Sequence, residues 1–195
     1  MSQQDHSISF TLPSWIDSYI HDIDTIIGID ARMAFVIEAS KRNVMHQTGG
    51  PFAAAIFEQE SGKLISLGVN LVTTQNLSML HAEMVAISLA QKKLHTYDLG
   101  TSKESSYELI TSTEPCAMCL GAIPWSGVHR VISGASDSDA RAIGFDEGPK
   151  VSDWEAALRS RQIEVISKLH RQDAADILQL YIQNEGHLYN SREDF

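Results

Sequence analysis

Cysteine is scarce in this chain of 195 residues, and its two copies, Cys116 and Cys119, belong to a single C-x-x-C motif. The sequence therefore excludes a disulfide framework, and a reducing compartment would keep both thiols available as metal ligands. Long apolar runs are also missing, because no stretch approaches the roughly 18 residues that a membrane-spanning helix needs. The first six residues lack the basic and apolar regions of a signal peptide. We expect a cytoplasmic protein with no membrane partner.

Basic side chains are in the minority: 15 Lys and Arg against 25 Asp and Glu give a formal net charge of −10. Such a surface repels polyanions unless a local basic patch overrides it. The basic residues stand singly or in pairs, such as Lys41-Arg42 and Lys92-Lys93, mostly where helices are predicted to end. Cations at those positions complement the helix dipole. We therefore expect no nucleic-acid partner.

Hydrophobic residues make up 43% of the chain, which suits one globular domain with terminal additions. We divide it into a helical extension over residues 1–28, a main domain over 29–168, and a C-terminal helix and tail over 169–195. The extension is expected to pack on the domain rather than to take part in chemistry.

Apolar periodicity predicts an alternation of helices and strands along the main domain. The predicted helices are a first one entered near Trp15 and ended by Gly28, one over about 31–46, one from His81, one from Cys116, one near 153–160, and the long last helix. The predicted strands cover 51–57, 64–72, 107–111, 128–133 and 162–166, and residues 73–78 form a polar loop. This order predicts an α/β fold of three α/β/α layers around a mixed, five-stranded central sheet.

Two fragments carry the chemistry: His81-Ala82-Glu83 and Pro115-Cys116-Ala117-Met118-Cys119. One histidine and two cysteines form a three-ligand zinc set, and a tetrahedral zinc then keeps a fourth position for a bound water or hydroxide. The metal lowers the pKa of that water towards neutrality. Glu83 is then placed to carry protons without being a ligand. We predict one Zn²⁺ per subunit, held by His81, Cys116 and Cys119.

Other interpretations of these fragments need a different context. A C-x-x-C motif alone also suits a redox pair in a thioredoxin-like fold, or half of a structural zinc site with two further ligands. Glu83 alone would be an ordinary first-turn glutamate favoured by the helix dipole. The H-x-E motif upstream of C-x-x-C favours a catalytic zinc.

The H-x-E and P-C-x-x-C fragments match the signature of zinc nucleobase and nucleoside deaminases, and the sequence resembles the cytidine-deaminase superfamily. Over residues 31–150 it is most similar to the guanine deaminases of bacterial type. The segments that carry this similarity are Gly49-Gly50-Pro51-Phe52, Asn70 with Val72-Thr73-Thr74, Glu114 to Ile123 with Trp125, and Ala142-Ile143-Gly144-Phe145-Asp146-Glu147. The resemblance implies a cytidine-deaminase-like domain, a homodimer, and conversion of a free nucleobase, guanine, to xanthine and ammonia in purine catabolism.

The resemblance also implies roles for single residues. Glu83 and Glu147 would be catalytic, and the substrate-binding residues would be Asn70, Phe52, Ala82, Glu114, Trp125 and Phe195. The C-terminal segment would be exchanged between subunits, with its aromatic tail over the site. Each role has a plainer alternative: Asn70 as a turn residue at a strand end, the aromatic residues as core, Glu147 as a solvated loop acid, and the last helix packed on its own domain.

Three rival functions stay open. A transfer-RNA adenosine deaminase would share zinc and Glu83 but needs a basic surface for the RNA. A deaminase of cytosine or of a related aminotriazine would differ only in the shape of its pocket. A non-catalytic, zinc-stabilised interaction domain would need neither Glu83 nor an open ligand position.

Overall fold

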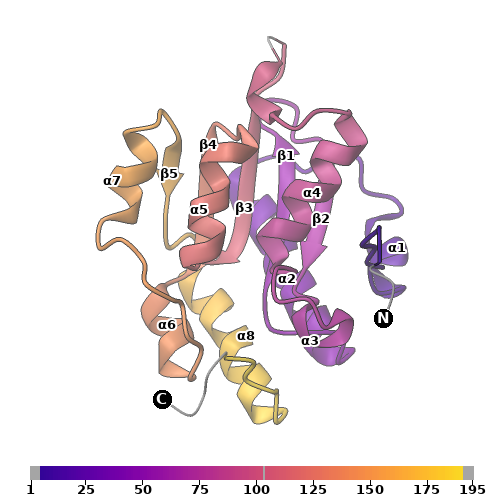
Figure 1. Cartoon of the computed structure of the whole chain (residues 1–195), viewed down its shortest axis with the longest axis vertical. Coiled ribbons are helices and arrows are strands. Elements are labelled where there is room, and N and C mark those ends of the chain that lie inside the picture. Colours follow the sequence, from indigo (N-terminus) through magenta and orange to yellow (C-terminus); the bar gives the residue numbers. More distant parts are fainter. Residues whose placement is uncertain (1–4, 103, 191–195) are drawn as a thin grey trace.

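The computed structural model describes residues 5–102 and 104–190, and a single sheet of five strands lies at its centre (Figure 1). The strands are, in chain order, β1 (Ala53–Glu58), β2 (Leu64–Val69), β3 (Tyr107–Thr113), β4 (Arg130–Ala135) and β5 (Glu164–Ile166). Their order across the sheet is β2-β1-β3-β4-β5. Strand β1 runs antiparallel to both of its neighbours, whereas β3, β4 and β5 are parallel. The predicted mixed five-stranded sheet is confirmed.

Helices cover both faces of this sheet, which confirms the predicted three layers. One layer contains α1 (Trp15–Ile20), α2 (Ile29–Met45) and α8 (Arg171–Gln183), and the other contains α4 (Ala82–Leu94), α5 (Ala117–Ser126) and α7 (Trp154–Arg159). In Figure 1, α4 and α5 lie in front of the strands and α2 lies behind them. Successive side chains of a strand point to opposite faces, so Phe57 joins one apolar layer and Ile56 the other. None of the described helices has the length and apolar character to cross a membrane.

Three short helical elements of the structure were not among the predicted ones. The expected loop over residues 73–78 contains a single helical turn, α3 (Val72–Gln75), which ends at Asn76 in the left-handed conformation (φ 53°). Residues 137–142 form helix α6 (Asp137–Ala142), because Ser136 and Asp139 make a capping box at its start. A 3₁₀ turn, η1 (Leu99–Thr101), follows α4. Each of these elements is too short for apolar periodicity to mark it.

The N-terminal helix is shorter than expected, since α1 ends at Ile20 rather than continuing towards Gly28. The chain that follows it pairs with the turn between β1 and β2 instead of completing further helical turns. The Ile26 amide donates to the Gly62 carbonyl at 2.8 Å, and Thr25 forms an isolated bridge with Lys63. The extension is therefore held on the main domain by backbone hydrogen bonds as well as by apolar contact.

A buried charge cluster joins three elements near the start of β3. The Glu108 carboxylate is fully buried and accepts from Arg32 Nη1 of α2 at 2.5 Å and from Arg130 Nη2 of β4 at 2.6 Å. Arg32 Nε also donates to the Ile26 carbonyl at 2.8 Å. This cluster lies at the start of β3, and the predicted ligand segment with Cys116 follows the other end of the same strand, at Thr113.

Candidate active site

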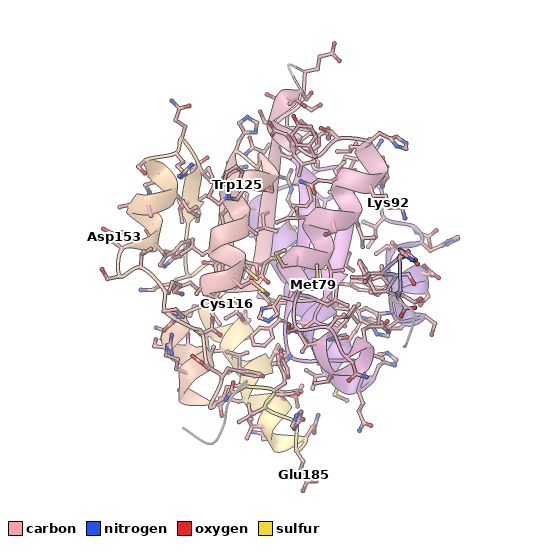
Figure 2. The ribbon with its side chains drawn as sticks, viewed as in Figure 1. Met79, Lys92, Cys116, Trp125, Asp153 and Glu185 are labelled. Atoms are coloured by element: carbon pink, nitrogen blue, oxygen red, sulfur yellow. The ribbon has the colours of Figure 1, made fainter. Side chains whose placement is uncertain are left out.

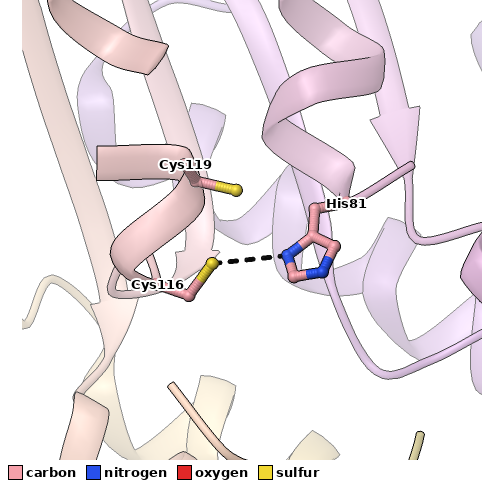
Figure 3. Close-up of side chains that lie close together, drawn as sticks. All are labelled: His81, Cys116 and Cys119. Atoms are coloured by element: carbon pink, nitrogen blue, oxygen red, sulfur yellow. Dashed lines mark hydrogen bonds between the residues drawn. The ribbon is translucent and has the colours of Figure 1, made fainter. Parts of the chain in front are cut away.

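The two predicted ligand fragments meet at the starts of neighbouring helices, beyond the end of β3 (Figure 3). His81 is the N-cap residue of α4, Cys116 is the N-cap residue of α5, and Cys119 lies in the first turn of α5. Their donor atoms all lie within 4.8 Å of one another. Cys116 Sγ is 3.4 Å from His81 Nδ1. The fold thus gathers three ligand-type side chains from parts of the chain 35 residues apart.

This set of donors fits zinc in both chemistry and spacing. Zinc–nitrogen and zinc–sulfur bonds at a tetrahedral angle place the two ligand atoms about 3.6 Å apart, close to the observed separation. The pKa of the Cys116 thiol is lowered to about 4, first by a hydrogen bond from Cys119 and also by contact with His81. The same hydrogen bond and burial raise the pKa of Cys119 well above its ordinary value. The lowered pKa of Cys116 favours its thiolate, which is the charged form that binds a metal cation.

Glu83 lies beside the ligand set without being part of it. Its side chain is in the first turn of α4, and its Oε2 accepts a hydrogen bond from Cys119 Sγ at 3.4 Å. The residue is only 7% exposed. Burial, and then the negative charge of Cys116, raise the pKa of the Glu83 carboxyl group above 4.5. A carboxylate whose charged form is disfavoured accepts a proton readily, which suits a proton carrier.

Glu147 brings a second buried carboxyl group to the same place. It is 6% exposed, and burial, then the charges of Cys116 and Glu83, raise its pKa to about 8. Its carbonyl accepts from the Ala117 amide at 2.9 Å, so the loop that carries it is attached to the start of α5. The alternative of a solvated loop acid does not describe this position.

Lys150 fastens this loop to the ligand segment, and nothing in the sequence pattern singles it out. Its Nζ donates to Glu114 Oε1 at 2.5 Å and to the Pro115 carbonyl at 3.2 Å, and it lies 3.1 Å from Asp137 Oδ1. The other oxygen of Glu114, Oε2, accepts from the Asp137 amide at 3.3 Å. Both carboxylate oxygens of Glu114 are thus engaged within the protein, although Glu114 lines the cavity.

A cavity of about 340 Å³ opens beside these groups. Eight of the residues singled out from the sequence line it: Phe52, Asn70, His81, Ala82, Glu83, Glu114, Cys116 and Glu147. Asn70 is 1% exposed, and its Oδ1 accepts from the Val72 amide at 3.2 Å, so it makes the strand-end turn and faces the cavity as well. Its Nδ2 is the side-chain group left to donate to a ligand. Phe52 packs edge-on against Phe145, with ring centroids 5.0 Å apart.

The structure does not bring Trp125 to this cavity. Its side chain is 81% exposed on α5, and Figure 2 shows it far along the helix from Cys116. Nine residues of helix separate the two positions by ~13 Å, and Trp125 lies on a different face of α5 from the buried Cys119. Phe195 lies outside the described residues.

Two further lining residues, Tyr189 and Asn190, follow α8 and belong to the tail that the resemblance places over the site, although neither was among the predicted site residues. Tyr189 packs edge-on against Phe145 with centroids 5.0 Å apart, and among the described residues its buried hydroxyl has no hydrogen-bond partner. Asn190 Oδ1 accepts from the Asp146 amide at 2.9 Å, and its Nδ2 donates to the Gly144 carbonyl at 2.8 Å. In the single chain, its own segment after α8 therefore closes one side of the cavity.

Comparison with known proteins shows which family this chain resembles. The family model described as the cytidine and deoxycytidylate deaminase zinc-binding region matches residues 29–135. A solved structure of guanine deaminase from Nitrosomonas europaea is 40% identical, with a TM-score of 0.87, over 94% of this chain and 100% of that chain. The guanine deaminase of Bacillus subtilis is 44% identical over 99 residues, which are 51% of this chain and 59% of that relative. A tRNA-specific adenosine deaminase of Buchnera aphidicola is 30% identical over 135 residues, 69% of this chain and 82% of the relative.

Proposed function

The chain belongs to the cytidine and deoxycytidylate deaminase family, and on that premise we propose that it is a zinc-dependent aminohydrolase that converts guanine to xanthine and ammonia. The observation that carries this proposal is that two buried carboxyl groups, Glu83 and Glu147, line the same cavity as His81 and Cys116. A cavity of about 340 Å³ lies at the small end of the range for small-molecule sites and suits a single base. The similarity to guanine deaminases supports guanine among the candidate bases.

In this proposal His81, Cys116 and Cys119 hold one zinc ion per subunit. When bound, zinc would lower the pKa of a coordinated water to near 7 and so would supply a hydroxide nucleophile for C2 of guanine. Glu83 takes up the proton that this water gives, and returns protons to the ring nitrogen and to the departing amine. Guanine and one water thus yield xanthine and one ammonia. Burial of Glu83 suits the uptake of this proton, because it raises the pKa of the carboxyl group.

The remaining groups hold the base. Asn70 Nδ2 is a donor that matches an acceptor atom on the purine, such as its carbonyl oxygen. Glu147 faces the edge that carries the ring N–H and the exocyclic amine, where a carboxylate accepts two hydrogen bonds and is able to share proton transfer. Phe52 and Phe145 present an apolar wall to the flat ring.

We further propose a cytoplasmic homodimer, built from a catalytic domain over residues 29–168 with the extension 1–28 and the C-terminal segment 169–195. Val151 is an exposed apolar residue that lines a groove of about 230 Å³ together with Leu120 and Pro124 of α5, and Trp125 of the same helix is exposed as well. Such a surface favours a second protein chain as its cover. Helix α8 packs on α2 and β4 of its own chain, so an exchange of this segment would reproduce those contacts between subunits.

A substrate panel tests the proposal. Ammonia release is measured with zinc-loaded enzyme on guanine, adenine, cytosine, their nucleosides, an aminotriazine and a transfer-RNA anticodon stem. We expect guanine to react fastest and the stem to be inert, because a net charge of −10 opposes an RNA partner. A reactive stem with inert guanine would show that the substrate is wrong although the chemistry holds. Release of ammonia from any base would exclude a non-catalytic zinc domain.

A further inference from the structure

A chain of hydrogen bonds runs from the N-terminal helix α1 to the wall of the cavity. Trp15 Nε1 donates to Thr48 Oγ1 at 3.0 Å, and Thr48 Oγ1 lies 2.7 Å from Asn43 Oδ1. Asn43 Nδ2 then donates to two backbone carbonyls, that of Gly50 at 2.8 Å and that of Asn70 at 3.0 Å. Trp15 lies outside the residues that the family model matches, whereas Asn70 lines the cavity.

The donor and acceptor groups of these side chains allow the series of hydrogen bonds to run in only one direction. An indole N–H only donates, so Thr48 accepts from Trp15 and directs its one hydrogen to Asn43 Oδ1. The amide of Asn43 therefore turns its oxygen towards Thr48 and its two N–H bonds towards the two carbonyls. A reversed Asn43 amide would set its oxygen against two carbonyl oxygens and face the Thr48 oxygen with N–H groups. The donor on Trp15 thus helps to determine which way Asn43 points.

Burial makes these bonds hard to replace. Asn43 is 0% exposed and Asn70 is 1% exposed, so water does not readily take over a lost partner. Trp15 is itself buried, and its ring stacks on His46 with centroids 5.8 Å apart and planes 10° apart. The indole is therefore held in the orientation that its hydrogen bond requires.

Asn70 has little freedom to move independently of the hydrogen-bonded residues Trp15, Thr48 and Asn43. Its amide donates to the Phe52 carbonyl at 3.0 Å, its carbonyl accepts from Asn43, and its Oδ1 accepts from the Val72 amide. Gly49 passes so close that a Cβ at this position would lie 1.8 Å from the Asn70 carbonyl oxygen. A displacement of Asn43 is therefore transmitted directly to Asn70 and to its neighbour Phe52.

We propose that Trp15, Thr48 and Asn43 are positioning residues that set the place of Asn70 against the base, so that the N-terminal extension takes part in substrate binding. The inference rests on the proposed role of Asn70. It assigns to the extension 1–28 a task beyond packing, because Trp15 supplies the first donor in a series of hydrogen bonds that ends at Asn70 in the cavity wall.

The experiment compares Thr48→Val, which removes the hydroxyl at nearly constant volume, with Thr48→Ser, which keeps it. Ammonia release from guanine is measured with the zinc-loaded, full-length chain. We expect Thr48→Val to raise KM about tenfold and to change kcat less than about twofold, since zinc and Glu83 are untouched. Thr48→Ser should stay within about twofold of wild type in both constants. Trp15→Phe keeps the stacked ring, loses only the donor, and should raise KM about threefold, which provides a second test if Thr48→Val folds poorly.

A double mutant separates positioning from general damage. With Asn70→Ala as the background, Thr48→Val should raise KM less than about twofold further, because the side chain through which it acts is gone. The inference is overturned if neither Thr48→Val nor Trp15→Phe changes KM, or if the increase is equally large in the Asn70→Ala background. A wild-type enzyme inert towards every base of the panel instead overturns the proposed function, together with the inference that depends on it.

Discussion

Replacing Glu83 by glutamine tests the proton carrier most directly, because the side chain keeps its size and loses only its ability to accept a proton. In the proposed reaction Glu83 takes part in every proton transfer, and each positioned acid or base contributes about 10²–10⁴-fold to the rate. We expect kcat for Glu83→Gln to fall by about 10⁴-fold, which corresponds to about 5.4 kcal/mol of barrier. The zinc content should stay at the wild-type level, since Glu83 is not one of the three ligands.

The stability of this variant should move in the opposite direction to its activity. Burial raises the pKa of Glu83 above 4.5, so its charged form opposes folding at pH values above the folded-state pKa. Glutamine removes that cost. The metal-free variant should therefore be at least as stable as metal-free wild type in urea at pH 8, and the difference should vanish as the pH falls below 4.5.

The assay combines steady-state ammonia release with a zinc determination on the same sample. Glu60→Gln, an exposed glutamate in the turn between β1 and β2, serves as the matched control and should retain full activity. A zinc-replete Glu83→Gln enzyme with kcat within tenfold of wild type would refute the role given to Glu83.

Three further predictions concern the metal, the buried charges and pH. Removing zinc with a chelator should abolish ammonia release, and added Zn²⁺ should restore it in wild type but not in Cys116→Ser, as followed by activity and metal content. Glu108→Gln should lower the free energy of unfolding by about 3 kcal/mol, because it leaves two arginines facing a neutral group, while kcat is unchanged; equal urea midpoints would contradict this. Hydrogen bonds from Arg171, then from Ser136, hold the pKa of Asp139 below its ordinary 3.8, so its carboxylate stabilises the fold above that pH and the contribution is lost as pH falls further. Asp139→Ala should therefore cost about 1 kcal/mol in urea denaturation at pH 7 and less at pH 3, and a loss that does not depend on pH would argue against this reasoning.

The strongest inferences from sequence were those in which local spacing decides the geometry. C-x-x-C across a first helical turn and H-x-E at a helix start bring their side chains to defined places, and the structure sets these fragments side by side. The strands of the sheet could also be predicted from the sequence, because buried strands such as β1 are rich in apolar residues and end at turn residues.

The roles of residues whose partners are distant in the sequence could not be predicted in this way. Lys150 bonds to Glu114 from 36 positions away, and Asn43 reaches Asn70 across 27. Neither has a local pattern that distinguishes it from a surface lysine or a helix-interior asparagine. Trp125 shows the converse: its place in a motif suggested the site, but the helix carries it away from the cavity and into solvent.

The unequal thiols of the ligand set make metal occupancy a function of acidity. At neutral pH the Cys119 thiol keeps a proton that a bound cation must displace, and at lower pH His81 adds a second one, because its pKa, which burial lowers, is raised overall by Cys116. A fall of one pH unit therefore weakens the apparent affinity for zinc by about tenfold for each proton that the metal must displace. Through this linkage the protein exchanges protons for metal, and acidification weakens the binding of zinc.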